Sequence, residues 1–240
     1  MSERDIYSPA YLRALFDEMA GTYGVVNLIS SFGFTRRWRR QCVEAGNLTP
    51  ESDVLDLMSG MGETWPIIIG KIGERGTIAA VDISPVMVEK SRHSSTFTTH
   101  QRIRILEEDV LNNSIESDSA DFIISTFGLK TFSGPQLNQL AGEIRRILRP
   151  GGNFSLLEIS VPPRRLLQSP YLFYLNNLIP LIGRVFLGNP DNYRMLGVYT
   201  QRFGDCGAMQ KALQSQGLKV EYQRYFFGCA TGVVGRKLPE

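Results

Sequence analysis

Short strand-like runs alternate with helix-like segments between Asp53 and Ile159, and this alternation restricts the fold more than any other feature of the sequence. Such a pattern is typical of a parallel sheet whose strands are joined by crossover helices. The strand-like runs cover Asp53–Leu57, Thr77–Val81, Ile103–Leu106, Asp121–Ser125 and Asn153–Ile159. The sequence therefore predicts an α/β fold with a parallel sheet in this part of the chain.

The segments between these strands carry helix start and stop signals. Ser84 is a good N-cap and Pro85 a good first helical residue, which predicts a helix over Pro85–Arg92. The other two helices predicted here are Glu63–Ile72 and Pro135–Leu148.

The pattern changes after Ile159. Prolines interrupt an apolar region there and predict an insertion rather than another repeat of the fold; they are Pro162, Pro163, Pro170 and Pro180. A helix near Asp205–Gln216 follows. Two strand-like runs, Leu218–Phe227 and Ala230–Val234, then predict a terminal antiparallel hairpin.

Charge and cysteine content argue against several classes of protein. The 26 Lys and Arg residues nearly balance the 24 Asp and Glu residues, so a dedicated nucleic-acid binder is disfavoured. The cysteines Cys42, Cys206 and Cys229 form no CxxC pair, so we expect neither a disulfide scaffold nor a metal site. We find no targeting segment and no apolar run long enough to span a bilayer, and expect a cytoplasmic protein.

Acidic residues and a glycine turn follow three successive strands, at the edge where open α/β sheets bind ligands. Asp56 stands before the turn that holds Gly60 and Gly62, and an acid here suits a positive group such as the amino group of S-adenosylmethionine. Asp82 is placed to accept both hydroxyls of a ribose, and Asp109 to accept from an adenine amino group. Taken alone, each is better explained as a plain turn, a helix-entry residue or a loop acid. Together they predict a site for an adenosine with a cationic tail.

Two other kinds of nucleotide or base chemistry do not fit. A dinucleotide fingerprint needs a third glycine where this chain has Trp65, and no P-loop follows. The fourth strand runs into Ser125–Lys130 and lacks the (N/D)PP(Y/F) stretch of base N-methyltransferases. Here Phe127 either faces the cofactor or fills the core, and Lys130 is either a solvated loop lysine or a cation that meets a substrate oxygen.

Several short segments carry motifs that are specific as a set. They are Phe16–Ala20, Ser31–Gly33, Val54–Leu57, Asp82–Ser84, Thr126–Leu129, Leu148–Gly152, Leu157–Glu158 and Asp191–Arg194. As a set they resemble the ubiquinone/menaquinone biosynthesis C-methyltransferase family of the UbiE type, a branch of the class I S-adenosylmethionine-dependent methyltransferases. The resemblance implies a Rossmann-like seven-stranded sheet with S-adenosylmethionine as the cofactor.

The resemblance also implies roles for individual residues. By position, the cofactor contacts are Met61, Asp82, Ile83, Asp109, Val110 and Thr126. Tyr23 and Asn27 match the family's N-terminal cover over the site. With Asn27, the expected substrate contacts are Phe127, Tyr171, Tyr174 and Tyr193.

The chain departs from the family at three places, one of which is the segment after Leu196. The Arg-Asn pair that usually follows Phe-Gly-Leu is here Lys130-Thr131, and the Gly-Gly-Thr-Gly-Asp turn is here Ser59–Glu63. Arg and Lys are not equivalent where a planar fork is needed, so the cofactor is better supported than the substrate. The cluster Arg36, Arg37, Arg39 and Arg40 around Trp38 is a solvated helix face or a patch for a membrane or nucleic acid, and the first is favoured.

We therefore expect a methyltransferase that acts on a carbon, or less readily an oxygen, of a small apolar phenol, quinol or enol-like molecule. Lys130 would stabilise the charge that develops on the substrate oxygen, and Tyr23 or a water held by Lys130 would be the base. In the alternative interpretation the chain keeps the cofactor site but transfers no methyl group. It would then be a cyclase, or a binding partner in a pathway complex, and the bound cofactor would have a structural role.

The apolar insertion is expected to roof the substrate pocket, which leaves peripheral membrane contact and a homodimer open. We expect one domain with four parts: an N-terminal helical cover over residues 1–50, a cofactor-binding core over 51–160, a substrate lid over 161–204, and a C-terminal helix and hairpin over 205–240.

Overall fold

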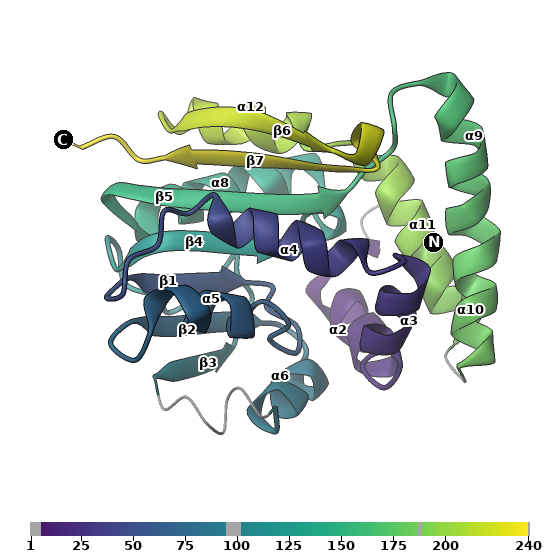
Figure 1. The fold of residues 1–240 in the computed structure, drawn as a ribbon, viewed down its shortest axis with the longest axis horizontal. Helices are drawn as coiled ribbons and strands as arrows, with labels where there is room; N and C mark the ends of the chain where they lie inside the picture. Colours follow the sequence, from purple (N-terminus) through teal and green to yellow (C-terminus); the bar gives the residue numbers. More distant parts are fainter. Residues whose placement is uncertain (1–5, 95–101, 187–188, 240) are drawn as a thin grey trace.

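The computed structural model describes residues 6–94, 102–186 and 189–239, and its centre is a seven-stranded sheet (Figure 1). The strands are β1 (Asp53–Leu57), β2 (Thr77–Asp82), β3 (Ile103–Glu107), β4 (Ala120–Thr126), β5 (Leu148–Ile159), β6 (Lys219–Tyr225) and β7 (Ala230–Arg236). Their order is β3-β2-β1-β4-β5-β7-β6. The first five pair in parallel, and β7 pairs antiparallel with both β5 and β6. The predicted sheet and its terminal hairpin are confirmed.

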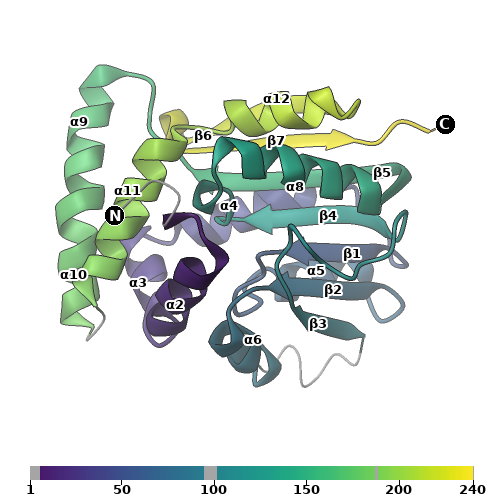
Figure 2. The same ribbon diagram turned by 180° about the vertical axis from the view of Figure 1, so that it is seen from behind.

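Helices cover both faces of this sheet. Two helices, α4 (Phe34–Glu44) and α5 (Trp65–Ile72), pack on one face, whereas α8 (Gly134–Ile147) and α12 (Gly207–Ser215) pack on the other (Figures 1 and 2). Side chains that alternate along a strand point to opposite faces. Val54 accordingly lies in the core beneath α4 and α5, and its neighbour Leu55 lies in the core beneath α8.

The boundaries near residue 150 differ from the prediction. Helix α8 ends at Ile147, and the Pro150–Gly152 segment belongs to the start of β5 rather than to a loop before it. Leu148 pairs with Ala120 of β4, and Gly151 takes a φ of 81°, which glycine adopts without strain.

The region after β5 is helical, which the prolines had concealed. It contains α9 (Arg165–Phe173), the π-helix η2 (Tyr174–Leu178), α10 (Ile179–Val185) and α11 (Pro190–Phe203). Pro170 lies inside α9, whereas Pro180 lies in the first turn of α10, where a missing N–H costs little. No helix within the described ranges is both long and apolar enough to cross a membrane.

These helices meet the N-terminal helices at the carboxyl ends of the parallel strands. Helices α9, α10 and α11 stand at that end of the molecule in both views, beside α2 (Pro9–Met19) and α3 (Tyr23–Ser30) (Figures 1 and 2). The α6 helix (Pro85–Arg92), capped by Ser84 as predicted, packs against α2. The edge of the sheet expected to bind ligands is therefore enclosed by helices from both halves of the chain.

Candidate functional site

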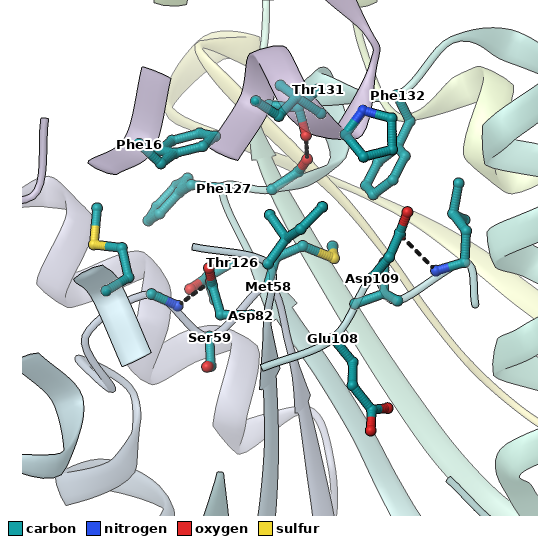
Figure 3. A pocket seen from close by; sticks show the side chains of 18 of the residues that line it. Phe16, Met58, Ser59, Asp82, Glu108, Asp109, Thr126, Phe127, Thr131 and Phe132 are labelled. Atoms are coloured by element: carbon teal, nitrogen blue, oxygen red, sulfur yellow. Dashed lines mark hydrogen bonds between the residues drawn. The ribbon is translucent and has the colours of Figure 1, made fainter. Parts of the chain in front are cut away.

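Two adjoining pockets occupy the space between the strand ends and these helices. The first pocket follows β1, β2 and β4 and the segment after β3, with α2 above it (Figure 3). Six of the predicted cofactor residues line it: Gly60, Asp82, Ile83, Asp109, Val110 and Thr126.

Asp82 organises the glycine turn of this pocket. Its Oδ2 atom accepts a hydrogen bond of 2.7 Å from the Gly60 N–H, and Oδ1 accepts one of 2.9 Å from the Ser84 N–H. Burial raises the pKa of this carboxyl group to about 6, although the two N–H donors favour the carboxylate. Asp82 thus fixes the turn while it lines the pocket.

Asp56 lies behind the turn and not in the pocket wall, which differs from the contact expected for it. Its Oδ2 atom accepts hydrogen bonds from Thr64 Oγ1 at 2.7 Å and from Trp65 Nε1 at 3.1 Å. Burial raises the pKa of Asp56 to about 7. The physical reason for the difference is Trp65, which stands in place of the third glycine and offers a buried donor that the carboxylate satisfies.

Two other residues of the turn also lie outside the first pocket's wall. Gly62 has a φ of 80°, and a Cβ atom there would clash with the Trp65 ring. Met61 points toward Gly24 of α3, since its Cε atom lies 3.5 Å from where a Cβ of Gly24 would stand. Glu63 lines the pocket instead.

Arg39 is a residue of this site that the sequence analysis placed on a solvated helix face. Only 8% of it is exposed, and it lines the first pocket; Trp38 beside it packs inward as expected. Its Nη2 atom lies 3.6 Å from Glu63 Oε1, and its guanidinium lies 5.2 Å from the centre of the Phe127 ring. Its place between Phe127 and Glu63 of the turn arises from tertiary packing, which the run of arginines does not reveal.

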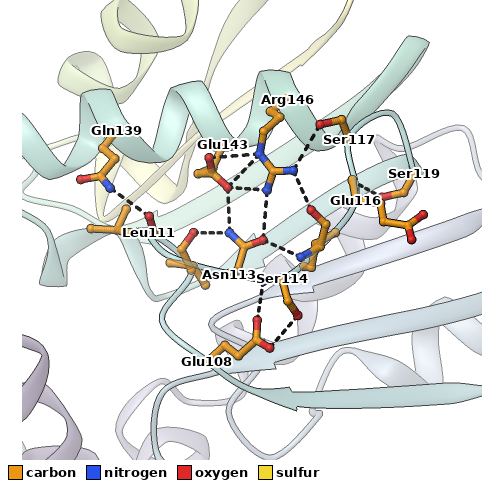
Figure 4. A network of polar contacts seen from close by, with 12 residues as sticks. Glu108, Leu111, Asn113, Ser114, Glu116, Ser117, Ser119, Gln139, Glu143 and Arg146 are labelled. Carbon is orange, nitrogen blue, oxygen red and sulfur yellow. Dashed lines mark hydrogen bonds and ion pairs between the residues drawn. The ribbon is translucent and has the colours of Figure 1, made fainter.

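The loop after β3 is fixed by a polar network (Figure 4). Asn113 and Arg146 both bond to Glu143 of α8, at 2.8 and 2.6 Å, and Arg146 also donates to the Ile115 carbonyl at 2.6 Å. These bonds lower the pKa of Glu143 and raise that of Arg146. The network holds the loop that brings Asp109 to the pocket, where its Oδ1 accepts from the Leu111 N–H at 2.9 Å.

Helix α2 is fastened across the first pocket by bonds to α6 and to the segment before it. Asp17 Oδ1 accepts from Ser84 Oγ at 2.6 Å, and Lys90 Nζ donates to the Ala20 carbonyl at 2.9 Å. Phe16 of this helix lines the pocket on the same side as Phe127 (Figure 3). The N-terminal cover thus encloses the first pocket as well as the second.

The second pocket is a mostly apolar cavity of about 360 Å³ between α3, α4, α11, η2 and the hairpin tip. All five predicted substrate residues line it: Asn27, Phe127, Tyr171, Tyr174 and Tyr193. The Tyr171 hydroxyl donates to the Cys229 carbonyl at 3.2 Å, which ties α9 to the hairpin. Phe127 belongs to the walls of both pockets.

Lys130 lies at the second pocket, but it is neither solvated nor unpartnered. Only 4% of it is exposed; its Nζ atom donates to Glu158 Oε1 at 2.9 Å and to the Phe127 carbonyl at 2.7 Å. Glu158 is fully buried, and its Oε2 accepts from the Lys130 N–H at 3.0 Å. Glu158 is a residue of this site not predicted from the sequence, although an acid at the end of the fifth strand repeats the pattern seen at the first three. The Tyr23 side chain lies outside the described part of the structure.

Two non-glycine residues at the junction take left-handed backbone angles. Met58 follows β1 with a φ of 52°, and Phe127 follows β4 with a φ of 69°. A Cβ atom on Gly128 would lie only 2.7 Å from Met58 Cβ, so the two turns are in close contact. Such a backbone conformation costs roughly 1 to 3 kcal/mol for each residue, and residues that adopt it cluster at functional sites.

The sequence profile of the ubiE/COQ5 methyltransferase family matches residues 5–237. The chain belongs to this family. A demethylmenaquinone methyltransferase of Lactiplantibacillus plantarum is 29% identical over 229 residues, covering 94% of this chain and 95% of that protein. The ubiquinone/menaquinone biosynthesis C-methyltransferase UbiE of Hydrogenovibrio crunogenus is 28% identical over 215 residues, covering 88% and 83%. A solved S-adenosylmethionine-dependent methyltransferase of Aquifex aeolicus shares the fold, with a TM-score of 0.55 at 18% identity over 80% of this chain and 85% of that one.

As a ubiE/COQ5 methyltransferase, the enzyme takes its methyl group from S-adenosylmethionine, and the first pocket fits that molecule. Three buried side-chain polar atoms within the described ranges have no hydrogen-bond partner, and two of them line this pocket: Ser59 Oγ and Arg39 Nε. A ligand with a charged amino-acid tail would satisfy both. These relatives are named as methyltransferases and none as a cyclase, so the comparisons do not support the alternative function.

Proposed function

We propose that the enzyme transfers the methyl group to a ring carbon of a quinol held in the second pocket, with S-adenosylmethionine in the first. The observation that carries this proposal is that Phe127 forms part of both walls. The methyl donor and the acceptor would then meet beside the Phe127 ring, in a space closed to bulk water. The apolar second cavity suits a quinol, and the relatives named above include a demethylmenaquinone methyltransferase.

The residues of the first pocket divide among the parts of the cofactor. Asp82 would accept from the ribose hydroxyls, and Asp109 from the adenine amino group. Arg39 would pair with the carboxylate of the methionine tail, and Glu63 with its amino group. When bound, S-adenosylmethionine supplies a methyl carbon attached to a positively charged sulfur, which is a good leaving group.

The residues of the second pocket prepare the acceptor. An ammonium has three N–H donors, and Lys130 spends two of them on Glu158 and Phe127. We propose that the third meets the acceptor oxygen, either directly or through one bound water, and that the proton of this oxygen passes to Tyr23 or to that water. The neighbouring ring carbon then attacks the methyl carbon, a carbon–carbon bond forms, the carbon–sulfur bond breaks, and the ring hydrogen leaves as a proton. Glu158 is a positioning residue that orients the Lys130 ammonium.

We propose the same division of the chain as the sequence indicated, with one domain whose residues 51–160 hold the cofactor and whose residues 161–204 cover the acceptor. Cys42, Cys206 and Cys229 are free thiols, which favours a reducing compartment such as the cytoplasm.

The test is incubation with methyl-labelled S-adenosylmethionine and a panel of acceptors that contains a short-chain demethylmenaquinol, a benzoquinol and a simple phenol. We expect label on a ring carbon of a quinol, identified by NMR of the product. Label found only on oxygen, or tight cofactor binding without transfer to any quinol, would contradict the proposal.

A further inference from the structure

An exposed apolar surface surrounds the second pocket, on segments far apart in the sequence. Phe32 stacks on Tyr174 with ring centres 6.5 Å apart, and the ring centres of Phe34 and Phe226 are 4.6 Å apart, so the turn after α3, α4, η2 and η3 (Phe226–Gly228) meet there. Large apolar side chains of these and the adjoining helices point to solvent. We call the following residues the apolar rim: Phe32, Leu166, Phe173, Leu181, Val185 and Phe227.

The helical part of the rim is unusually open. Leu166 is 88% exposed and Phe173 is 61% exposed, on an α9 helix that stands at the edge of the molecule (Figure 1). Burying one such side chain contributes about 1.5 to 3 kcal/mol, so a surface of this kind is typical of a contact with a partner or a membrane.

The stretches of chain that carry the apolar rim contain basic residues and no acidic ones, although Glu18 and Asp191 stand at their ends. No acidic residue occurs between Glu18 and Glu44, between Glu158 and Asp191, or between Glu221 and Glu240, and these three stretches carry the whole rim. The same stretches present exposed arginines that pair with no carboxylate of the described residues: Arg36, Arg37, Arg164, Arg165, Arg184 and Arg224. The net charge of the chain is only +2, so this positive surface is balanced by acids elsewhere.

We propose that the apolar rim and its arginines dock the enzyme on an anionic lipid bilayer, from which an apolar acceptor enters the second pocket. The arginines would bind the lipid headgroups while the rim side chains enter the interface between headgroups and acyl chains. A second copy of this chain fits less well, because a symmetric contact would bring the two positive surfaces together. The route for the acceptor rests on the function proposed above, whereas binding to lipid does not.

The test is co-sedimentation of the full chain with vesicles of phosphatidylcholine alone and of phosphatidylcholine mixed with phosphatidylglycerol. We expect binding to the mixed vesicles that weakens as salt is added. Arg165→Glu/Arg184→Glu should lower the partition coefficient by about fivefold or more per site, which corresponds to about 1 kcal/mol for a basic residue near an anionic surface. Leu166→Ser/Phe173→Ser should also lower it.

Matched controls lie away from the rim. Lys71→Glu/Lys211→Glu makes the same change in net charge, and Leu238→Ser removes another half-exposed leucine; both should bind like the wild type. Calorimetry with S-adenosylmethionine checks that each variant is folded. The proposal is overturned if the wild type does not prefer the mixed vesicles, if rim and control variants bind alike, or if light scattering shows a dimer that only the rim variants disrupt. Vesicle binding by an enzyme that methylates no quinol would instead contradict the proposed function alone.

Discussion

The Nζ atom of Lys130 lies 2.9 Å from Oε1 of Glu158, and this ion pair is buried beside the second pocket. Removal of one partner of a buried pair leaves the other charge without compensation. Substitution of Lys130 should therefore affect stability as well as the proposed transfer, and a double variant separates the two effects.

Lys130→Met should lower kcat by about 10²-fold or more, since it removes a donor from a developing oxyanion. It should also destabilise the fold by roughly 3 to 5 kcal/mol, because Glu158 is left buried without its partner. The affinity for S-adenosylmethionine should hardly change. In Lys130→Met/Glu158→Gln the stability should largely return while kcat stays low, as measured by denaturant unfolding and single-turnover rates. Recovery of kcat in the double variant would show that Lys130 acts only through the fold.

Asp82→Ala should weaken S-adenosylmethionine binding by roughly 1.5 to 3 kcal/mol, the range for loss of a charge-assisted partner. The variant also frees the Gly60 N–H, so the turn itself loses its anchor. Isothermal calorimetry measures the change, and Asp121→Ala at the opposite end of the sheet serves as the control. An unchanged dissociation constant would contradict the role given to Asp82.

The raised pKa of Asp56 predicts a dependence of stability on pH. The folded value of about 7 exceeds the ordinary value of 3.8, so the folded protein binds a proton that the unfolded chain releases. Between these values stability therefore rises as pH falls, by an amount on the order of 4 kcal/mol at most. The Asp56→Asn variant cannot take up this proton, so it does not gain this stability. The wild type should gain stability relative to the variant as pH falls from about 8 to about 5; a constant difference would show that Asp56 does not take up the proton.

Arg146→Ala should loosen the loop that presents Asp109, without touching the first pocket. We expect the dissociation constant of S-adenosylmethionine to rise by about three- to tenfold, equivalent to the loss of roughly 1 kcal/mol of hydrogen bonding. Arg149→Ala is the matched control, since Arg149 pairs with Asp53 and Asp121 at the other end of the strands. Equal effects of the two substitutions would show general destabilisation instead.

Tyr174→Ala should raise the KM for the acceptor and leave cofactor affinity unchanged. The side chain lines the second pocket and stacks with Phe32, so its loss enlarges the cavity. Steady-state kinetics with a short-chain quinol measure the effect. A change in cofactor affinity without a change in KM would contradict the proposal that Tyr174 contacts the acceptor.

The sheet could be predicted because its signals are local. Aliphatic runs, Ser84 before Pro85, and acids at strand ends all lie within a few residues of the structure they specify. The direction of a side chain at a strand end is not local. Asp56 turns away from the pocket because Trp65, nine residues later, offers its Nε1 donor.

Pairs distant in the sequence were likewise hidden. Lys130 meets Glu158 only because β4 and β5 are adjacent in the sheet, and nothing near Lys130 identifies that partner. The helices after β5 were concealed for another reason. A proline inside a helix usually ends it, but here the helix continues through Pro170 into the π-helix η2.

The two pockets draw on almost separate parts of the chain and share Phe127. The strand ends of β1, β2 and β4 line the first pocket, the proposed adenosine side, whereas α3, α4, η2, α11 and the hairpin tip line most of the second, the proposed acceptor side. A lineage can therefore exchange its acceptor by changing residues of α9 to α11 or of the hairpin tip, while selection keeps the adenosine side as it is. Family members with different acceptors should diverge first in those segments. Asp82 and the glycine turn should be retained in all of them.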